Sequence, residues 1–427
     1  MAYFTNSPVT RAVVCITLFL CSKDVFAQPS ISSFNPASGP VGTSVTITGS
    51  DFDAAPAKNI VYFGAVQAVV TAATNSTLTV KVPAGATFQP VTVTTNKLTA
   101  YADKPFRATF SGIDSLNANS FARVADISVN QNAKNIAAGD LNGDGKADLA
   151  VTNDLSNSIA IFRNTSTPGT VSLIHQANIP AGTAADPSGT TMGDLNGDGK
   201  LDLAVTTPST GKVLVYVNQS ANNGSIGLYG PLEFSAGLKP VSVAIDDLDG
   251  DGKSDLIVAN SGSNTVSLLH NTTVTGGTYP VFGEKTDYAT GATPSFVCTG
   301  DLNGDHKPEI VVINYDSKSV SIFKNISTAG NPAFEQKLDF TIGNHPTSVS
   351  VGDLDGDGKP DLATGNFSFA KSISLLKNTS AGGNISFDPS FDFTYMELYH
   401  LALGDVDGDG QLDITAPNFY AASLSVF

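Results

Sequence analysis

The stretch DLNGDGKADLAVTN, residues 140–153, decides the fold, because its first nine residues recur along the chain at a nearly fixed period. Side chains with oxygen stand at positions 1, 3, 5 and 9 of this loop, glycine stands at positions 4 and 6, and an apolar run follows. Five more copies follow at separations of 54, 53, 54, 52 and 52 residues. They read DLNGDGKLD from Asp194, DLDGDGKSD from Asp247, DLNGDHKPE from Asp301, DLDGDGKPD from Asp353 and DVDGDGQLD from Asp405. A period of this length is typical of repeat proteins, in which each unit forms one small group of packed elements.

The chemistry of the loop favours calcium. Calcium takes six to eight oxygen ligands, and carboxylates or amides on alternate residues can wrap around one ion. Glycine at position 6 permits the tight turn that this wrapping needs, and position 7 would add its backbone carbonyl while its side chain faces solvent. Each loop holds three or four carboxylates, and two of them about 4 Å apart repel by roughly 4 kcal/mol at an effective dielectric of about 20. We therefore expect about six bound calcium ions, in preference to the alternative that Asp, Asn and Gly merely form turns.

The expected calcium ligands are the residues at positions 1, 3, 5, 7 and 9 of the six loops. They are Asp140, Asn142, Asp144, Lys146, Asp148, Asp194, Asn196, Asp198, Lys200, Asp202, Asp247, Asp249, Asp251, Lys253, Asp255, Asp301, Asn303, Asp305, Lys307, Glu309, Asp353, Asp355, Asp357, Lys359, Asp361, Asp405, Asp407, Asp409, Gln411 and Asp413. The fourth loop departs from the others, with His306 in place of glycine and Glu309 in place of aspartate. Because histidine adopts positive φ less readily than glycine, we expect this site to be occupied but to be the weakest of the six.

Four strands are predicted in each repeat. A small-residue strand precedes every loop, the run LAVTN or its equivalent follows it, and an alternating strand such as SIAIFRN from Ser158 comes about ten residues later. A fourth segment, such as FGEKTDY from Phe282, completes the unit. Four strands in 52–54 residues predict the blades of a β-propeller. Cys298 occupies a slot that holds Ala, Ser or Thr in the other repeats, so we interpret it as a small core residue and not as a reactive thiol.

The ends of the repeat region suggest how the ring closes. The segment FARVADI from Phe121 resembles the fourth strand but precedes the first loop, whereas nothing follows Phe427 to supply that strand to the last blade. Pairing of the first segment with the last blade would close six blades and remove an exposed edge. The alternative is a seven-bladed parent of which this chain is a C-terminally truncated fragment, since the sequence ends inside a strand.

The six DxDGDGxxD-type loops, each preceded by a GD or DD step and followed by a DLAV-like strand, resemble FG-GAP/VCBS repeats. That family includes integrin α-chain propellers and many bacterial surface proteins. The resemblance covers residues 121–427, and it implies a calcium-binding β-propeller with calcium in the six loops named above. It does not settle function, because one fold hosts many activities.

The segment before the repeats resembles a second family. The stretch ISSFNPASGPVGTSVTITGSDF from Ile31, together with the Phe63-Gly64 turn, resembles the IPT/TIG immunoglobulin-like domains. This resemblance implies a small β-sandwich over residues 28–110, acting as a spacer or interaction module without catalytic residues. We expect a linker at residues 111–120, so the predicted fold class is all-β: an immunoglobulin-like sandwich followed by a propeller of six or seven four-stranded blades.

The N-terminus predicts export. Residues 1–27 combine a positive charge at Arg11, an apolar run over residues 12–21 and a small-residue end at Ala27, as a secretory signal peptide does. No later segment is apolar enough over about 20 residues to predict a transmembrane helix. Removal of this leader would leave Cys298 as the single cysteine. The net charge of the whole sequence is −16, which makes nucleic acid a poor partner. We expect a secreted or cell-surface protein.

These features together predict a non-catalytic adhesion or binding module for an extracellular protein or polysaccharide. We predict no catalytic residue, because the five histidines fall at different places in their repeats and neither HExxH nor a nucleophile elbow occurs. The alternative is a calcium-dependent polysaccharide lyase or hydrolase. Triplets of the form Asn-x-Ser/Thr at Asn164, Asn325 and Asn378 are either glycan acceptors or strand-ending turns.

Overall fold

The computed structural model describes residues 27–87, 90–109, 127–129, 132–167, 170–221, 224–274, 277–367, 373–394, 398–406, 411–418 and 423–427. Their regular structure is almost entirely strand, and the helical part of these residues is a single turn, η1 (Pro56–Lys58). The all-β prediction is therefore confirmed. The predicted signal peptide up to residue 26 and the predicted linker at 111–120 lie outside the described residues.

The N-terminal domain is a sandwich of two four-stranded sheets, with strand orders β1-β3-β7-β6 and β5-β4-β8-β9. Its strands are β1 (Ser30–Asn35), β2 (Ser38–Gly39), β3 (Ser44–Ser50), β4 (Ile60–Phe63), β5 (Val66–Ala68), β6 (Val70–Ala73), β7 (Thr77–Lys81), β8 (Pro90–Thr95), β9 (Leu98–Pro105) and β10 (Arg107–Ala108). Alternation along β3 explains the core: Val45 and Ile47 are fully buried, whereas Ser44 and Thr46 face solvent. The inward residues of both sheets form one hydrophobic core.

Six antiparallel sheets follow, one for each repeat, and we call them blades one to six. Blade one is β11 (Ala133–Gly139), β12 (Asp148–Asn153), β13 (Ser158–Asn164) and β14 (Leu173–Pro180); blade two is β15 (Thr190–Gly193), β16 (Asp202–Thr207), β17 (Lys212–Asn218) and β18 (Leu228–Ser235); blade three is β19 (Pro240–Asp246), β20 (Asp255–Asn260), β21 (Thr265–Leu269) and β22 (Thr286–Ala289). Blade four is β23 (Pro294–Gly300), β24 (Glu309–Asn314), β25 (Ser319–Phe323) and β26 (Leu338–Thr341); blade five is β27 (Pro346–Gly352), β28 (Asp361–Asn366), β29 (Ile373–Leu376) and β30 (Phe391–Phe393); blade six is β31 (Ala402–Gly404), β32 (Asp413–Asn418) and β33 (Ser423–Val426). The order within each blade follows the sequence, so neighbouring strands pair as a meander.

Each acidic loop is the turn between the first and second strands of its blade. In blade one, Asp148 pairs with Gly139 across this turn, and the same pairing recurs in the other blades. All six loops therefore lie at equivalent ends of their sheets.

The predicted fourth strand is shorter than expected in blade three, because Phe282 forms only an isolated bridge with Asn271 and regular pairing begins at Thr286.

Neighbouring blades pack through shared cores. Leu141 at position 2 of the first loop is buried between blades one and two, and Leu195 is buried between blades two and three. Equivalent cores join blades three to four, four to five and five to six. Loops one to five are thus each anchored by a leucine at position 2 in an interface between sheets, whereas loop six has Val406 at this position.

Closure between blades six and one remains a prediction. On the free side of blade one, Ile136 is 58% exposed beside a groove of about 390 Å³ that Ile127 and Val129 also line. The predicted closing segment at 121–126 lies outside the described residues, and blade six has three strands among those that are described.

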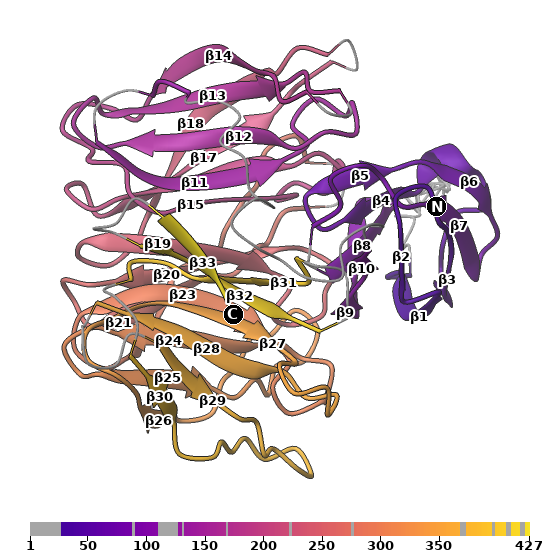
Figure 1. Ribbon diagram of the computed structural model, residues 1–427. Coiled ribbons are helices and arrows are strands. Elements are labelled where there is room, and N and C mark those ends of the chain that lie inside the picture. Colours follow the sequence, from indigo (N-terminus) through magenta and orange to yellow (C-terminus); the bar gives the residue numbers. More distant parts are fainter. Residues whose placement is uncertain are drawn as a thin grey trace, which may run out of the picture.

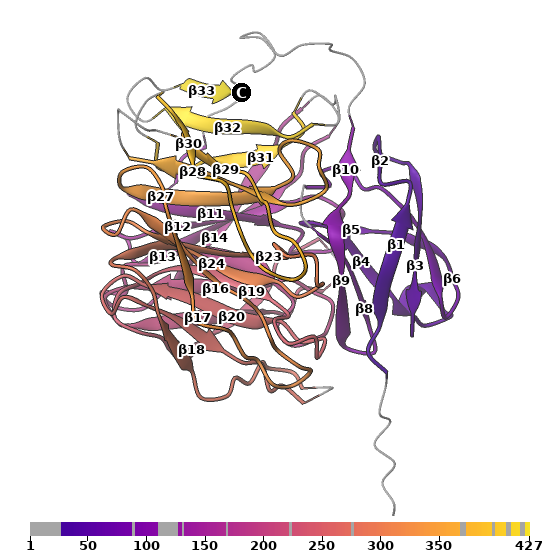
Figure 2. The ribbon, with the colours of Figure 1, turned by 90° about the horizontal axis from the view of Figure 1, so that it is seen from below.

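The N-terminal domain lies against the side of the blades where the acidic loops are. Figures 1 and 2 show it at one side of the six sheets, with β5 and β9 nearest to them. A backbone hydrogen bond of 2.8 Å from Asp140 N to Ala65 O joins the domain to the first loop. The domain is therefore docked on the blades, not held away from them as an extended spacer.

Candidate cation-binding loops

Backbone amides hold the first carboxylate of loops one to five in a fixed position. In loop one, Asp140 Oδ1 accepts hydrogen bonds from Gly143 N at 2.8 Å and Asp144 N at 3.1 Å, and Oδ2 accepts from Gly145 N at 2.8 Å. Loops two to five repeat the bonds from positions 4 and 6 to the first aspartate. Positions 3 and 5 each accept an amide two residues later in the same way. The loop is a short coil wound around its own oxygens.

The acid at position 9 closes the coil. Asp148 Oδ2 accepts from Leu141 N at 3.0 Å, while its Oδ1 accepts from Asn164 N at the end of β13, at 2.8 Å. In loop four the longer Glu309 makes the same two contacts, at 2.8 Å with Leu302 N and 3.3 Å with Asn325 N. The departure at position 9 is therefore accommodated, although one contact is longer.

Position 6 needs a backbone conformation that favours glycine. Its φ is +81° at Gly145 and +66° at His306. An L residue with a Cβ is destabilised in this left-handed region, whereas glycine is not. The strain expected at His306 is thus present in the structure.

The acid at position 9 is withdrawn from water in loops one to five. Asp202, Asp255 and Glu309 are fully buried. Desolvation raises the pKa of Asp148 to about 7 and the pKa values of Asp255 and Glu309 to about 8, although backbone amides oppose the shift. A cation among these oxygens would compensate for the desolvation and favour the ionised form.

The spacing of the oxygens fits a divalent ion. In loop five, Asp353, Asp355 and Asp361 each offer a carboxylate oxygen, and the three oxygens lie within 4.8 Å of one another. Calcium binds oxygens at about 2.3–2.6 Å, so one ion can reach oxygens that are separated by roughly 5 Å. The donor set, all oxygen and largely carboxylate, is the one that calcium prefers.

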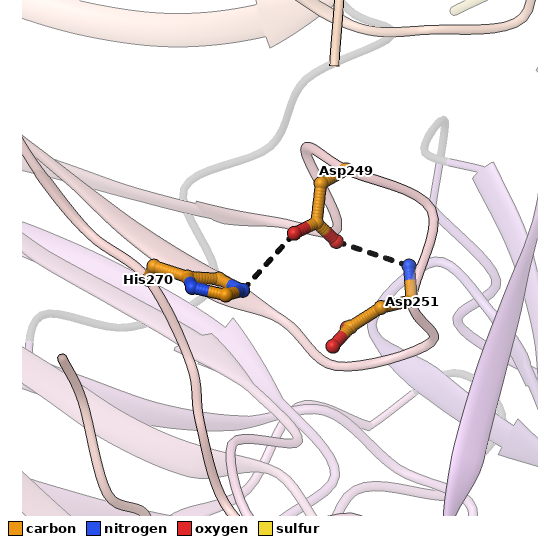
Figure 3. Close-up of side chains that lie close together, drawn as sticks. All are labelled: Asp249, Asp251 and His270. Atoms are coloured by element: carbon orange, nitrogen blue, oxygen red, sulfur yellow. Dashed lines mark hydrogen bonds and ion pairs between the residues drawn. The ribbon is translucent and has the colours of Figure 1, made fainter. Parts of the chain in front are cut away.

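A basic side chain approaches position 3 of two loops. His270 Nε2 lies 3.0 Å from Asp249 Oδ2, while the other oxygen of Asp249 accepts from Asp251 N at 3.1 Å (Figure 3). In blade five, Lys377 forms ion pairs with Asp355 and Asp357. The residue before the Asn at or just after the end of the third strand is basic in four repeats, namely Arg163, His270, Lys324 and Lys377. In two of them it contacts other groups: Arg163 donates to Gly224 O and Lys324 pairs with Glu335.

Most of the predicted ligands are brought together, and loop six is described only in part. Loops one to five place positions 1, 3, 5 and 9 around one turn, whereas Asp407 and Asp409 lie outside the described residues. Asp413 Oδ2 accepts from Val406 N at 2.7 Å, which matches the other loops. The expectation that position-7 side chains face solvent is wrong for Lys200 and Lys307. Each donates at 2.7 Å to a backbone carbonyl of its own blade, because a folded-back ammonium group can satisfy that acceptor.

An asparagine that sequence reasoning missed connects successive loops. Asn218 Nδ2 donates to Leu201 O in its own loop at 3.0 Å and to Leu141 O in the preceding loop at 2.9 Å. Its Oδ1 accepts from Ser220 N at 2.9 Å and so forms a tight turn. The same three contacts recur at Asn271, Asn325 and Asn378.

These contacts decide between the two interpretations of the Asn-x-Ser/Thr triplets. Asn325 is 1% exposed and Asn378 is fully buried, and the side-chain nitrogen of each donates two hydrogen bonds. A glycan on such a nitrogen would break both bonds. The triplets are strand-ending turns, and the serine or threonine at the third position supplies the amide that the asparagine accepts.

Comparisons with known proteins agree with this architecture. FG-GAP-like repeats match residues 140–205, 194–258, 247–312 and 301–364, and an IPT/TIG domain matches residues 29–108. Integrin alpha-PS5 of Drosophila melanogaster is 29% identical over a match that covers 31% of this chain and 15% of the integrin. The match thus spans less than a sixth of that relative's length.

Solved structures with a similar outline are distant. A putative 6-phosphogluconolactonase from Bacteroides uniformis is 11% identical with a TM-score of 0.49, and the alignment covers 86% of this chain and 92% of that one. An auxiliary nutrient binding protein from Bacteroides thetaiotaomicron is 12% identical with a TM-score of 0.35, over 91% of this chain and 95% of that one. Neither likeness carries an argument about function.

The fold and loops define a repeat protein of bladed β-sheets that carries an immunoglobulin-like domain. The chain belongs to the FG-GAP-like repeat family, since the four matches together span more than half of its residues. Among the described residues, no helix has the length and apolarity needed to cross a membrane.

Proposed function

We propose that this chain is an exported, calcium-binding protein that acts as a non-catalytic adhesion or binding module for an extracellular protein or polysaccharide. The observation that carries the proposal is the common geometry of the described loops, in which three or four acids are wound around one point and the acid at position 9 is buried in loops one to five. Residues 28–110 would form the immunoglobulin-like domain and residues 121–427 the calcium-binding propeller, after a signal peptide at 1–27.

Calcium would be held by the side chains at positions 1, 3, 5 and 9 of each loop and by the carbonyl at position 7. Its charge would neutralise the carboxylates and fasten the ends of the first two strands of each blade. Extracellular calcium modules bind at roughly 10⁻⁴–10⁻³ M. At about 1 mM calcium, a site at the tight end of that range stabilises the fold by about 1.4 kcal/mol. We propose about six such sites, with loop four the weakest.

A binding role is supported by the family and by the one named relative. Integrin alpha-PS5 is similar to part of this chain, and a rigid scaffold that presents many loops suits recognition. Export is supported by the leader-like N-terminus. The ligand, by the charge of −16, would not be nucleic acid.

The test begins with purified residues 28–427. Elemental analysis should find five or six calcium ions per chain, and thermal unfolding should shift to a markedly lower temperature in excess chelator. Arrays of glycans and of extracellular proteins should then give binding without turnover. A calcium-free chain with unchanged melting would refute the metal sites. Cleavage of an acidic polysaccharide would instead establish the alternative, a calcium-dependent lyase or hydrolase.

A further inference from the structure

The N-terminal domain is hydrogen-bonded to the backbone of the second loop. Tyr62 in β4 is 5% exposed, and its hydroxyl donates a hydrogen bond of 3.2 Å to Gly199 O. The fit is close, because a Cβ added at Gly199 would lie 1.9 Å from Ile60 Cδ1. Gly199 is position 6 of its loop, and its amide donates to Asp194 Oδ2 at 2.8 Å. One glycine therefore holds a predicted metal ligand with its N–H and the docked domain with its carbonyl.

The third loop repeats the arrangement. Thr99 N in β9 donates to Gly252 O at 2.9 Å, and Gly252 N donates to Asp247 Oδ2 at 2.8 Å. Beside it, the hydroxyl groups of Tyr101 and Ser254 are 2.7 Å apart. Two adjacent loops thus use the same backbone position, position 6, for a ligand contact and for an interdomain contact.

The fourth loop is different. Residues 304–306, positions 4 to 6 of that loop, are exposed, whereas Gly199 and Gly252, at position 6 of loops two and three, are buried. An added Cβ at Gly304 would meet no atom within 4 Å, whereas at Gly197, position 4 of loop two, it would lie 2.3 Å from Lys97 O. The two glycines have nearly the same φ, +77° and +73°. The loops are therefore equivalent in their own geometry but differ in whether the N-terminal domain covers them.

We propose that cation binding in loops two and three is coupled to docking of the N-terminal domain, an inference that rests on the calcium binding proposed above. An ion that fixes the first aspartate also fixes the direction of the carbonyl at position 6, because both belong to one short coil. Loss of the ion lets the carboxylates repel and the coil open, and the acceptors for Tyr62 and Thr99 move. By linkage, the docked domain in turn raises the cation affinity of those loops.

Hydrogen exchange of the full chain measures docking directly. The amides of Thr99 and Asp140 are protected by bonds across the interface, to Gly252 O and Ala65 O. The amides of β8, which pairs with β4 inside the sandwich, serve as the internal control. We expect chelation to speed exchange at Thr99 and Asp140 by about tenfold and to leave exchange in β8 unchanged. Tenfold is the change in the undocked population that loss of one ion causes when calcium is at about ten times its dissociation constant.

Matched variants assign the effect to the covered loops. Asp198→Asn removes a position-5 carboxylate from loop two, and Asp305→Asn removes the equivalent one from loop four; each Oδ1 accepts one amide two residues later, at 3.0 and 3.1 Å. Tyr62 in β4 and Thr99 in β9 belong to one sheet, so release of Tyr62 from loop two also weakens the bond of Thr99 to loop three. In millimolar calcium, D198N should lose one ion and exchange faster at Thr99, whereas D305N should lose one ion with no change there.

The outcomes separate the two proposals. If the chain binds calcium but D198N and D305N leave exchange at Thr99 equally slow, the coupling is refuted and the metal sites stand. If elemental analysis finds no calcium in the unmodified chain, both proposals fail. Faster exchange at Thr99 in D198N alone, with β8 still protected, supports the coupling.

Discussion

The side-chain amide of Asn218 donates a hydrogen bond of 2.9 Å to the backbone carbonyl of Leu141, which belongs to the loop of the preceding blade. Through Asp202, whose Oδ1 accepts from Asn218 N at 2.7 Å, this contact reaches the acid that closes the loop of its own blade. Successive loops are therefore joined by hydrogen bonds as well as by packed cores. A change in the conformation of one loop can therefore alter the next loop through this asparagine.

Replacement of Asn218 by alanine should destabilise the chain by about 3 kcal/mol, because it leaves two buried carbonyls, of Leu141 and Leu201, without a donor. Chemical denaturation in calcium measures the loss. Asn331→Ala is the control, since Asn331 is exposed and its side chain makes a bond of 3.3 Å within its own turn. Equal losses for the two variants would contradict the inter-blade role.

Alanine at Gly197 should cost more stability than alanine at Gly250. Both positions have φ near +70°, so each substitution carries the left-handed penalty of about 1–2 kcal/mol. The new Cβ at Gly197 would also lie 2.3 Å from Lys97 O, which adds about 1–3 kcal/mol of overpacking, whereas at Gly250 no atom lies within 4 Å. Thermal unfolding in calcium compares the two, and a larger loss for G250A would contradict the docked arrangement.

Replacement of His306 by glycine should strengthen the fourth calcium site. His306 has a φ of +66°, and removal of its Cβ relieves roughly 1 kcal/mol of strain in the folded loop. Calcium titration of the H306G variant should show the weakest site tightened several-fold. The reciprocal variant, Gly145→His, places the same strain in loop one, where an added Cβ meets no atom within 4 Å, and should weaken one site. Unchanged titrations for both variants would show that position 6 does not set affinity.

Cys298 should be unreactive while the chain is folded. It lies on β23 beside the core between blades four and five, and desolvation raises its pKa to about 12. Because the thiolate is the reactive form, little of it exists at pH 8. Labelling with a chromogenic disulfide reagent should be slow in calcium and fast in denaturant. Rapid labelling of the folded chain would show that the thiol is accessible and ionised.

Local sequence patterns predicted the loops and strands, whereas contacts between residues far apart in the chain could not be predicted in this way. The loop at residues 140–148 and the strand that starts at Ser158 were visible because oxygen donors, glycines and period-two alternation are encoded within a few neighbouring residues. Strand pairing within blades followed from their order.

The missed features all join residues that are far apart in the chain. Tyr62 and Gly199 are 137 residues apart, and Asn218 and Leu141 are 77 residues apart. Neither tyrosine nor asparagine has a local pattern that identifies its partner, because docking depends on the shapes of two finished surfaces. The recurrence of Asn at the end of the third strand was the available signal. The triplets at Asn164, Asn325 and Asn378 were noticed as glycan acceptors or strand-ending turns, but the contacts of such asparagines with the preceding loop were not predicted.

The buried asparagines have a practical consequence for production of the protein. The acceptor triplet begins at or just after the end of the third strand of blades one to five, at Asn164, Asn218, Asn271, Asn325 and Asn378, and eukaryotic secretory cells modify such triplets on nascent, unfolded chains. Sugars attached at that stage to the last four would occupy nitrogens that the finished blades bury, and would keep adjacent sheets apart. A recombinant host that lacks this glycosylation, or one in which it is blocked, is therefore the one that should yield a native chain.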